Sequence, residues 1–425
     1  MTQIAVIGTG YVGLSTGVGM AELGHTVVGA DIDAVKVKSL TSGISPIAEA
    51  GMNEGIAHNV SAGRLSFTTD VVGSIEAADV VFLCLPTPQG DDGSADLSYI
   101  EAVARQIGPH LAPGTVVVNK STVPVGSSVQ VGQWLGRTDV FVVSNPEFLR
   151  QGTALQDFLH PTRVVVGGDS EAAVEKVASM YAAVDAPILR MNAASAEALK
   201  YAANSFLATK LTFVNAIADI CELVGADVFD VVSGLGLDPR IGNQFLNPGP
   251  GWGGSCFPKD TRALVKIAEG NGYDFALLRG VIQTNDEQYE RIALKVVEVC
   301  GGSVAGKTIA SWGLTFKANT DDLRDSPAIA ILSTLKDMGA TIRAYDPAAR
   351  GVEMLPWVQR CDSALETCEG ADALAVLTEW PEFAAITPAD VASRLSSPVV
   401  VDGRNVLNPQ QWKSSGFQYR GVGRS

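Results

Sequence analysis

The amino-acid sequence predicts an α/β protein with two doubly wound domains joined by a long central helix. Apolar runs of strand length alternate with helix-like segments through residues 1–190, and the same alternation resumes after residue 300. Between the two, residues 193–226 have the composition of one helix of about 30 residues, which would be about 45 Å long. We therefore expect domains at residues 1–192, 193–300 and 301–425.

The chain opens on a strand, a glycine-rich turn and a helix. Residues 4–7 are an apolar run, residues 8–13 read Gly-Thr-Gly-Tyr-Val-Gly, and residues 14–23 are helix-like. A second strand is expected at residues 25–30 and ends in Asp31. The first glycine of such a motif makes the turn, the second admits a pyrophosphate, and the third lets helix pack on strand. An acid at the end of the second strand binds ribose hydroxyls and repels a 2′-phosphate, so the motif favours NAD over NADP.

Further strand-like segments follow in both halves of the chain, and those of the first half are mostly apolar. In the first half they are residues 80–85, 116–119, 140–143 and 163–167, and in the second 307–312, 341–345, 371–377 and 398–402. Continuous apolar runs suit parallel sheets covered on both faces, whose ligands bind beyond the carboxyl ends of the strands. A helix-like segment, 328–338, and Asp346 repeat the order found around Asp31, which indicates a weak internal repeat.

The run Gly-Pro-Gly-Trp-Gly-Gly-Ser-Cys-Phe-Pro-Lys-Asp at residues 249–260 predicts a reactive thiol. Its glycines allow close approach of a substrate, and Pro258 suits the first position of a helix that ends near Gly270. Cys256 would lie at the positive end of that helix, which favours the thiolate. Asp260 follows about one turn later. A nucleophilic thiol together with a dinucleotide motif predicts an enzyme that oxidises an alcohol past the aldehyde to the acid.

Composition excludes several classes of protein. A net charge of −15 and a pI near 4.7 argue against a nucleic-acid-binding surface. No apolar run reaches the roughly 18 residues of a membrane helix, and no basic leader precedes the first strand, so we expect neither a membrane span nor a signal peptide. The six cysteines show no metal spacing, which predicts a reduced, cytoplasmic enzyme without a metal site. The cysteines other than Cys256 read as structural, and the four histidines as non-catalytic.

Seven ordered blocks resemble the UDP-glucose/GDP-mannose dehydrogenase family over nearly the whole chain. They are residues 8–13, 120–125, 145–149, 200–210, 238–260, 313–327 and 402–405. The compact lead before Cys256 resembles the members that act on UDP-glucose more than those that act on GDP-mannose. The resemblance implies two Rossmann-like domains, a dimer-forming helical centre or a higher homo-oligomer, NAD as cofactor, and a role in nucleotide-sugar metabolism and polysaccharide biosynthesis.

The reaction that the resemblance implies is the oxidation of UDP-glucose to UDP-glucuronate in two hydride transfers. Cys256 would form a thiohemiacetal and then a thioester, which water hydrolyses. The same chemistry on GDP-mannose or a UDP-N-acetylhexosamine stays open. A two-electron hydroxyacid dehydrogenase and a non-catalytic nucleotide sensor are the other readings, and neither needs Cys256.

The resemblance also assigns residues to roles. The expected catalytic residues are Cys256 as nucleophile, Lys200 and Asn204 at the developing oxyanion, Asp260 in proton transfer, Glu147 as the base of hydrolysis, and Thr122 orienting water. The expected cofactor residues are Gly8, Gly10, Tyr11, Val12, Gly13, Asp31, Lys36, Thr87, Thr122, Glu147, Lys259 and Arg324. The expected substrate residues are Glu147, Phe148, Leu149, Lys200, Asn204, Arg240, Phe245, Leu246, Asn247, Gly249, Gly253, Lys317 and Arg404, with Arg240 reaching the substrate of a neighbouring subunit.

Three positions depart from the family's pattern. Gln151 stands where Glu is frequent, so hydrolysis would depend on Glu147 alone, because an amide cannot accept the proton. Thr162 replaces a frequent Asp, and Ala216 a frequent Glu.

Overall fold

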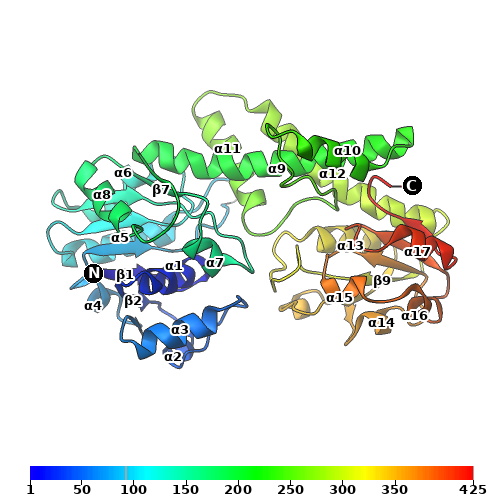
Figure 1. The fold of residues 1–425 in the computed structure, drawn as a ribbon, viewed down its shortest axis with the longest axis horizontal. Coiled ribbons are helices and arrows are strands. Elements are labelled where there is room, and N and C mark those ends of the chain that lie inside the picture. Colours follow the sequence, from blue (N-terminus) through cyan, green and yellow to red (C-terminus); the bar gives the residue numbers. More distant parts are fainter. Residues whose placement is uncertain (91–92, 425) are drawn as a thin grey trace. The chain divides into compact units, whose positions relative to one another are not determined.

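The computed structural model describes residues 1–90 and 93–424 and has the mixed α/β fold that the sequence predicts. The chain forms two compact units (Figure 1). Unit 1 comprises Met1–Ala203 and Lys266–Gly272, and unit 2 comprises Asn204–Val265 and Tyr273–Ser425. Each unit holds one sheet of Rossmann-like topology.

The sheet of unit 1 has eight strands in the order β3-β2-β1-β4-β5-β6-β7-β8. The strands are β1 (Gln3–Ile7), β2 (Thr26–Ala30), β3 (Leu65–Thr68), β4 (Val80–Leu83), β5 (Val116–Asn119), β6 (Phe141–Ser144), β7 (Val164–Gly168) and β8 (Ile188–Met191). The helices are α1 (Tyr11–Glu22), α2 (Ala34–Thr41), α3 (Met52–Ser61), α4 (Val71–Ile75), α5 (Ser98–Ile107), α6 (Ser127–Leu135), α7 (Ala154–Leu159) and α8 (Glu171–Ser179), with a 3₁₀ turn at Gly108–His110.

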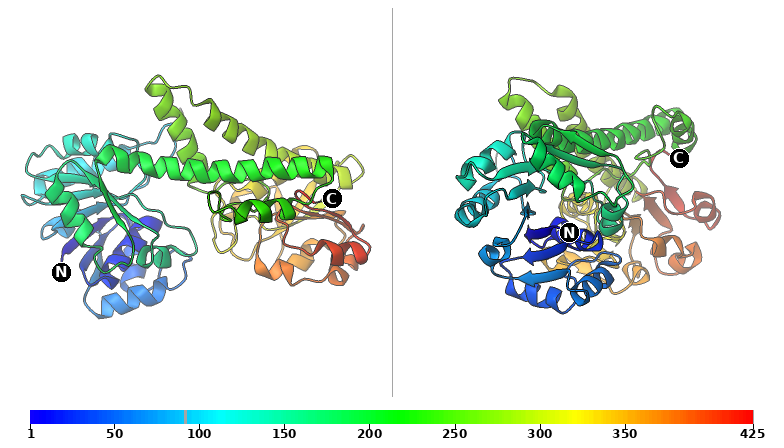
Figure 2. Two further views of the ribbon diagram at one scale, coloured as in Figure 1. Left: turned by 45° about the horizontal axis from the view of Figure 1, so that its top comes forward. Right: turned by 60° about the vertical axis from the view of Figure 1, so that its left-hand side comes forward.

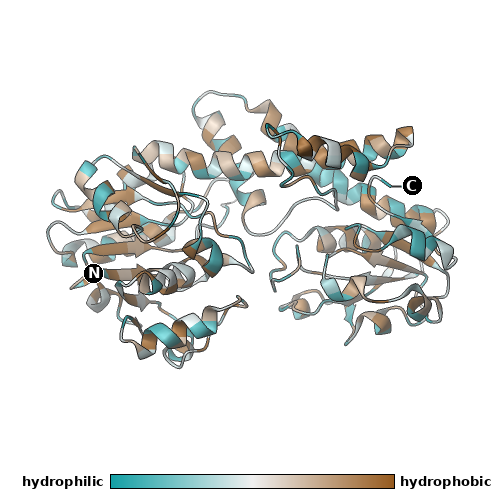
Figure 3. Ribbon diagram, viewed as in Figure 1, coloured by the Kyte–Doolittle hydropathy of each residue, from teal (hydrophilic) through white to brown (hydrophobic). Residues whose placement is uncertain are grey.

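Alternate side chains of each central strand fill the cores on the two faces of this sheet. Ile4 and Val6 of β1 belong to one apolar cluster, whereas Ala5 and Ile7 belong to another. The strands therefore need apolar residues at every position, which explains the continuous runs in the sequence. Figure 3 shows the strands as apolar segments.

One expectation about this sheet is wrong: it is not parallel throughout, because β6 and β7 run antiparallel. The connection between them, residues 145–163, contains only α7, which has six residues and packs against α1. A helix that short is about 9 Å long and does not return the chain to the amino ends of the strands. β7 therefore starts at the carboxyl edge of the sheet and runs back.

Unit 2 contains a parallel six-stranded sheet in the order β11-β10-β9-β12-β13-β14 (Figure 2). The strands are β9 (Thr308–Trp312), β10 (Thr341–Tyr345), β11 (Val358–Arg360), β12 (Ala373–Val376), β13 (Val399–Asp402) and β14 (Gln418–Arg420). Its shorter helices are α13 (Pro327–Asp337), α14 (Ala364–Thr367), α15 (Pro381–Ala384), α16 (Pro388–Ala392) and α17 (Pro409–Ser414), with a 3₁₀ turn at Val352–Met354.

The predicted long helix is present as α9 (Ala193–Val224), with 32 residues. It is followed by α10 (Val228–Leu237), α11 (Phe257–Gly270) and α12 (Ala276–Val299). α11 begins one residue earlier than expected, so Pro258 is its second residue. No described helix is both long and apolar enough to cross a membrane.

The internal repeat is visible in the turns that follow β1 in unit 1 and β9 in unit 2. Gly8 has φ +89° and its N–H donates to the carbonyl of Ala30, while Gly313 has φ +99° and donates to Tyr345. The carboxylate of Asp346 accepts from the backbone of Leu314 and Thr315, as that of Asp31 accepts from Thr9.

Candidate active site

The glycine turn of unit 1 has room for a pyrophosphate only at Gly10. A Cβ on Gly13 would lie 1.8 Å from the carbonyl oxygen of Gly8, and a Cβ on Gly8 would lie 2.5 Å from that of Cys84. A Cβ on Gly10 would meet nothing within 4 Å. Gly10 is also the N-cap of α1, and no side chain caps that helix end. These features fit the phosphates of a dinucleotide, which bind at such helix termini.

Asp31 directly follows β2 and lies beside this turn. One carboxylate oxygen accepts from the amide and hydroxyl of Thr9 and forms a 2.9 Å ion pair with Lys36, and the other accepts from the amide of Asp33. Burial raises the pKa of Asp31, but the hydrogen bonds from Lys36 and the backbone outweigh it and leave the pKa below its ordinary value. Asp31 is therefore anionic at neutral pH, as ribose recognition and exclusion of a 2′-phosphate require.

Glu147 and Lys200 form a buried ion pair in unit 1. The Nζ of Lys200, on α9, lies 2.8 Å from Oε1 of Glu147, and both side chains are at most 8% exposed. The other oxygen of Glu147 accepts from the amide of Leu149, and the ammonium also lies 5.4 Å from the centre of the Phe148 ring. Burial raises the pKa of Glu147, but Lys200 and the hydrogen bond from the amide of Leu149 lower it by more. The pKa is therefore below its ordinary value, and the carboxylate is ionised at neutral pH.

The two threonines expected near the cofactor are linked at the carboxyl ends of β4 and β5. The hydroxyl of Thr87 donates to the carbonyl oxygen of Thr122 over 3.0 Å. Sequence reasoning missed Glu49, which joins the glycine turn to the segment after Glu147. Its carboxylate accepts from the hydroxyl of Tyr11 and from the amide of Gly152, next to Gln151.

Cys256 has the placement of a nucleophile within unit 2. It directly precedes α11, and its carbonyl accepts from the amide of Asp260 in the first turn of that helix. Among the described residues no cysteine forms a disulfide, and Cys256 is exposed whereas the other five cysteines are buried. A thiol at the amino end of a 14-residue helix experiences the positive end of the helix dipole, which stabilises the thiolate.

Asp260 lies in a buried polar network with Asn204 and Lys259. The Nδ2 of Asn204 donates to one carboxylate oxygen over 2.6 Å, and the ammonium of Lys259 lies 2.7 Å from the other. Asp260 itself is 1% exposed. The structure thus joins three residues that the sequence analysis named separately. Lys259, expected near the cofactor, is bound here to Asp260.

The glycine-rich segment before Cys256 is held by four amide and hydroxyl side chains that sequence reasoning missed. Asn285 of α12 accepts from the amide of Trp252 and donates to its carbonyl, and the hydroxyl of Tyr289 donates to the same carbonyl. Asn215 accepts from the amide of Gly249, and Gln288 donates to its carbonyl. We call Asn215, Asn285, Gln288 and Tyr289 the amide clamp. Asn and Gln spaced along a helix without a ligand motif give no signal in the sequence.

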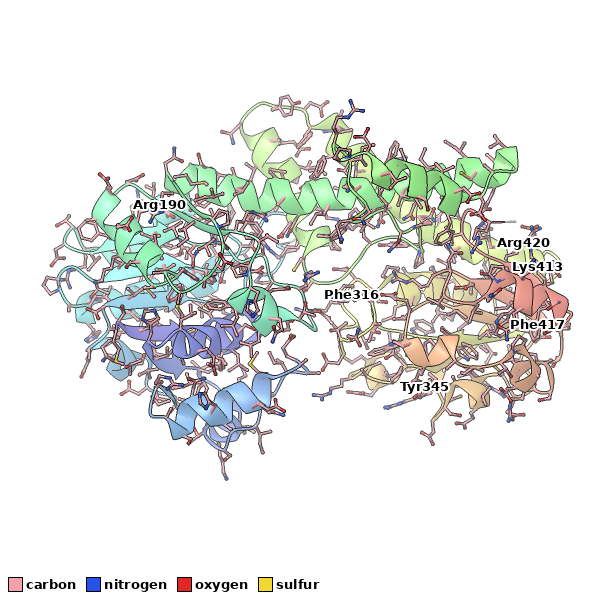
Figure 4. The ribbon with its side chains drawn as sticks, in the orientation of Figure 1. Arg190, Phe316, Tyr345, Lys413, Phe417 and Arg420 are labelled. Atoms are coloured by element: carbon pink, nitrogen blue, oxygen red, sulfur yellow. The ribbon has the colours of Figure 1, made fainter. Side chains whose placement is uncertain are left out.

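The same segment packs against two other expected substrate segments. A Cβ on Gly253 would lie 1.9 Å from the carbonyl oxygen of Asp325, and one on Gly254 would meet the ring of Phe316. Arg404 donates to the carbonyl oxygens of Phe316 and Leu377. Figure 4 shows Phe316 at one end of the second sheet and Phe417 at the opposite end. Residues 249–254, 316–325 and 404 therefore gather at the carboxyl ends of the strands, where ligands bind in such sheets.

Backbone strain marks the same segments. The non-glycine residues with positive φ in the described chain are Phe245, Asn319, Asp325 and Asn405, at 45–61°. Each lies in one of the three segments 238–260, 313–327 and 402–405. Such conformations are costly and are retained mostly at binding and catalytic sites.

Comparison with known proteins identifies the domains. Residues 2–185 match the NAD binding domain of the UDP-glucose/GDP-mannose dehydrogenase family, residues 194–287 its central domain, and residues 310–409 its UDP binding domain. The chain belongs to this family. It is an NAD-dependent dehydrogenase, which confirms the resemblance found in the sequence.

Individual members of the family resemble the chain over its whole length. The UDP-glucose 6-dehydrogenase TuaD of Bacillus subtilis is 45% identical, over 100% of this chain and 94% of its own. A UDP-glucose dehydrogenase from Pyrobaculum islandicum superposes with a TM-score of 0.92 at 36% identity, covering 100% of this chain and 98% of that chain. A UDP-D-ManNAc dehydrogenase from Pyrococcus horikoshii superposes with a TM-score of 0.89 at 29% identity, covering 99% of each chain.

The roles of the remaining expected residues of the family site stay predictions. Arg240 is 86% exposed on its side chain and pairs with Asp238. Arg324 pairs with Asp322, and the pKa of its guanidinium is raised by Asp322 and by the nearby Cys256. Asn247 is exposed, and the ammonium of Lys317 lies 5.8 Å from the ring centre of Phe316.

Proposed function

We propose that this protein oxidises UDP-glucose to UDP-glucuronate with two molecules of NAD. The observation that carries the proposal is Cys256: an exposed cysteine outside any disulfide, directly before α11, at the end of a glycine-rich segment held by the amide clamp. A dehydrogenase that stops at the aldehyde has no use for such a thiol. When bound, NAD supplies the hydride acceptor for both oxidations.

The first oxidation removes a hydride and a proton from the C6 alcohol and gives the aldehyde. Lys200 and Asn204, four residues apart on α9, hold the C6 oxygen as negative charge develops on it. Asp260 accepts hydrogen bonds from Asn204 and Lys259 and takes part in moving the released proton. Removing one preorganised donor of this kind costs roughly 3–4 kcal/mol of transition-state stabilisation.

The second oxidation uses the thiol. The sulfur of Cys256 adds to the aldehyde carbon, forming a C–S bond, and the carbonyl oxygen gains a proton to complete the thiohemiacetal. Loss of a hydride from carbon and of the hydroxyl proton then leaves the thioester. Water attacks the thioester carbon, the C–S bond breaks, and the thiolate of Cys256 leaves with the carboxylate as product.

Glu147 is the proposed acceptor of the proton from the attacking water, with Thr122 orienting that water. The carboxylate is ionised, as a base must be, although the ion pair with Lys200 weakens its basicity. Because Gln151 cannot accept the proton, the proposal assigns this step to Glu147 alone.

The choice of sugar nucleotide follows the relatives. The relative named UDP-glucose 6-dehydrogenase is 45% identical and the solved UDP-glucose dehydrogenase 36%. The dehydrogenase of UDP-D-ManNAc is 29% identical but has nearly the same fold, which keeps a UDP-N-acetylhexosamine as the alternative. GDP-mannose is the third candidate.

The deciding experiment counts NADH formed per sugar nucleotide consumed, with UDP-glucose limiting and GDP-mannose and a UDP-N-acetylhexosamine in parallel. We expect two NADH per UDP-glucose, and at most one from a Cys256→Ala variant, because the first oxidation does not use the thiol. One NADH per UDP-glucose would refute the thioester route. Two NADH from another sugar nucleotide alone would keep the route and change the substrate.

A second copy of the chain is the proposed partner. Phe206, Phe213 and Ile220 are seven residues apart on α9, so they share one face, and they are 65%, 53% and 51% exposed. An exposed apolar stripe of this kind marks a protein interface. Phe213→Glu should lower the sedimentation coefficient to that of one chain, and Val129→Glu, at an exposed apolar residue of α6, should leave it unchanged.

Two further proposals concern organisation and location. The chain is divided at residues 192 and 300 into three parts with different proposed roles. Residues 1–192 bind NAD, residues 193–300 carry the thiol segment, and residues 301–425 bind the sugar nucleotide. The cytoplasm is the proposed location because Cys256 must stay reduced to act.

A further inference from the structure

Lys120 is a buried cation that none of the steps above uses. It follows β5 directly, and its side chain is among the buried ones, with 4% of the residue exposed. Its ammonium donates to Oδ1 of Asn145 over 3.0 Å and to the hydroxyl of Tyr181 over 3.3 Å. It also lies 5.7 Å from the ring centres of Phe158 and Tyr181.

No carboxylate forms an ion pair with Lys120 among the described residues. A buried ammonium held only by neutral partners is costly to keep, and replacing such a group by an apolar side chain often leaves stability unchanged or increases it. Stability of the fold therefore does not account for a lysine at this position.

The position of Lys120 relates it to Glu147. Asn119 and Ser144 are partners in the parallel pairing of β5 with β6, so Lys120 and Asn145 are the next residues on adjacent strands. Asn145 is fixed from three sides, because it accepts from Lys120 and Tyr181 and donates to the carbonyl of Val165. Glu147 lies two residues beyond Asn145, in the segment that this network anchors.

Four titratable groups from four different parts of unit 1 lie near Lys120. They are the thiol of Cys84 after β4, the carboxylate of Glu147 after β6, the ammonium of Lys200 on α9 and the phenol of Tyr181 after α8. Burial lowers the pKa of Lys120 to about 8, with Cys84 and Glu147 raising it and Lys200 lowering it. Lys120 is therefore mainly a cation at neutral pH, and Glu147 is the full negative charge near it.

We propose that Lys120 is a positioning residue for the Glu147 carboxylate: it anchors the segment after β6 through Asn145 and places a second buried positive charge near that carboxylate. The proposal rests on the role of Glu147 in the proposed reaction. The two lysines have different roles. Lys200 forms an ion pair with the carboxylate of Glu147, whereas Lys120 holds the backbone segment through Asn145 and adds a nearby positive charge.

The test compares Lys120→Met, which removes the charge and keeps the length, with Lys120→Arg, which keeps the charge. The rate of turnover of UDP-glucose is measured against pH. For Lys120→Met we expect the acid limb of kcat to move to higher pH by about one unit, because Glu147 loses a neighbouring cation. We also expect kcat near neutral pH to fall about 10-fold with little change in KM, because the base is less well placed. Lys120→Arg should keep the acid limb of the unmodified enzyme.

Thermal unfolding separates this role from a structural one. Lys120→Met should unfold within a few degrees of the unmodified protein. A large loss of Tm with an unmoved acid limb would show that Lys120 serves the fold and would overturn the proposal. Tyr181→Phe is the matched control: it removes one hydrogen bond to Asn145 without changing charge, and should leave the acid limb in place.

Two further outcomes have defined meanings. If Lys120→Met does not fold, Lys120→Gln carries the same measurement, and failure of both to fold would overturn the proposal. If the unmodified protein forms no NADH from any of the sugar nucleotides, the proposed function fails and this inference fails with it. An active unmodified enzyme whose acid limb coincides with that of Lys120→Met refutes this inference alone.

Discussion

Asn204 on α9 donates to the carboxylate of Asp260 on α11, and the ammonium of Lys259 binds the other oxygen of that carboxylate. This arrangement fixes both ends of a carboxylate that has 1% exposure. Cys256, the proposed nucleophile, immediately precedes the first turn of α11, and Asp260, the proposed proton-transfer group, lies within that turn.

Asp260→Asn should therefore impair catalysis far more than binding. The amide keeps the shape of the side chain but loses the charge that orients Lys259 and accepts a proton. We expect kcat to fall about 10²–10⁴-fold, with KM for UDP-glucose within a few-fold. Steady-state NADH formation measures both. Asp274→Asn, which removes an exposed partner of Arg279, should change neither value.

Gly10→Ala and Gly13→Ala should fail in different ways. A Cβ on Gly10 meets no protein atom, so the variant should fold normally but obstruct the pyrophosphate and raise KM for NAD about 10-fold or more. A Cβ on Gly13 would lie 1.8 Å from the carbonyl of Gly8, so that variant should lose several degrees of Tm. Equal effects of the two changes on Tm would contradict this reading of the turn.

The Glu147–Lys200 pair makes part of the stability depend on pH. The pKa of Glu147 is below its ordinary value of about 4.3, so the pair stabilises the folded protein above that pH and the contribution is lost as pH falls through the folded pKa. The difference in unfolding free energy between the unmodified protein and Glu147→Gln should therefore be largest near neutral pH and shrink in acid. Urea unfolding at several pH values measures it.

The control for that experiment is an exposed pair. Arg190, labelled in Figure 4, bonds to Glu175 at the surface of unit 1. Glu175→Gln should leave the unfolding free energy nearly unchanged at every pH, because an exposed ion pair contributes little to stability. If the difference in unfolding free energy between the unmodified protein and Glu147→Gln stays constant with pH, the ion pair does not make stability depend on the titration of Glu147.

Asn285→Leu should loosen the segment before Cys256. The change removes two hydrogen bonds to Trp252. The amide of Trp252 loses its acceptor, while its carbonyl keeps the bond from Tyr289, and the loss costs about 1–3 kcal/mol of stability. We expect kcat to fall about 10-fold and the rate of alkylation of Cys256 to change. Gln283→Leu, at an exposed position on the same helix, should alter neither. Unchanged alkylation in Asn285→Leu would refute the role of the clamp.

The features that the sequence predicts are local. The glycine turn ending at Gly13, the acid that closes β2 and the thiol before α11 each lie within a few residues of the pattern that reveals them. The long helix is also visible, because no proline interrupts residues 193–224. Such patterns depend on backbone conformation and on burial, which act over one or two turns or strands.

The features that the sequence does not predict depend on distant pairs. Asn285 and Trp252 are 33 residues apart, and Glu49 and Gly152 are 103 apart. The reversed direction of β7 depends on where α7 packs, which no local pattern records. Lys120 reads as a polar residue at a strand end, because its partners Asn145 and Tyr181 lie 25 and 61 residues further along the chain.

Hydrogen bonds from the protein reach both oxygens of the Asp346 carboxylate. One oxygen accepts from Leu314, Thr315 and Trp380, and the other from Ala348 and Ala349. The turn after β9 has the shape of a coenzyme turn, but six donors of the protein bond to its carboxylate, against four at Asp31. A designer who wished to install a second coenzyme there would have to free that carboxylate before changing any loop.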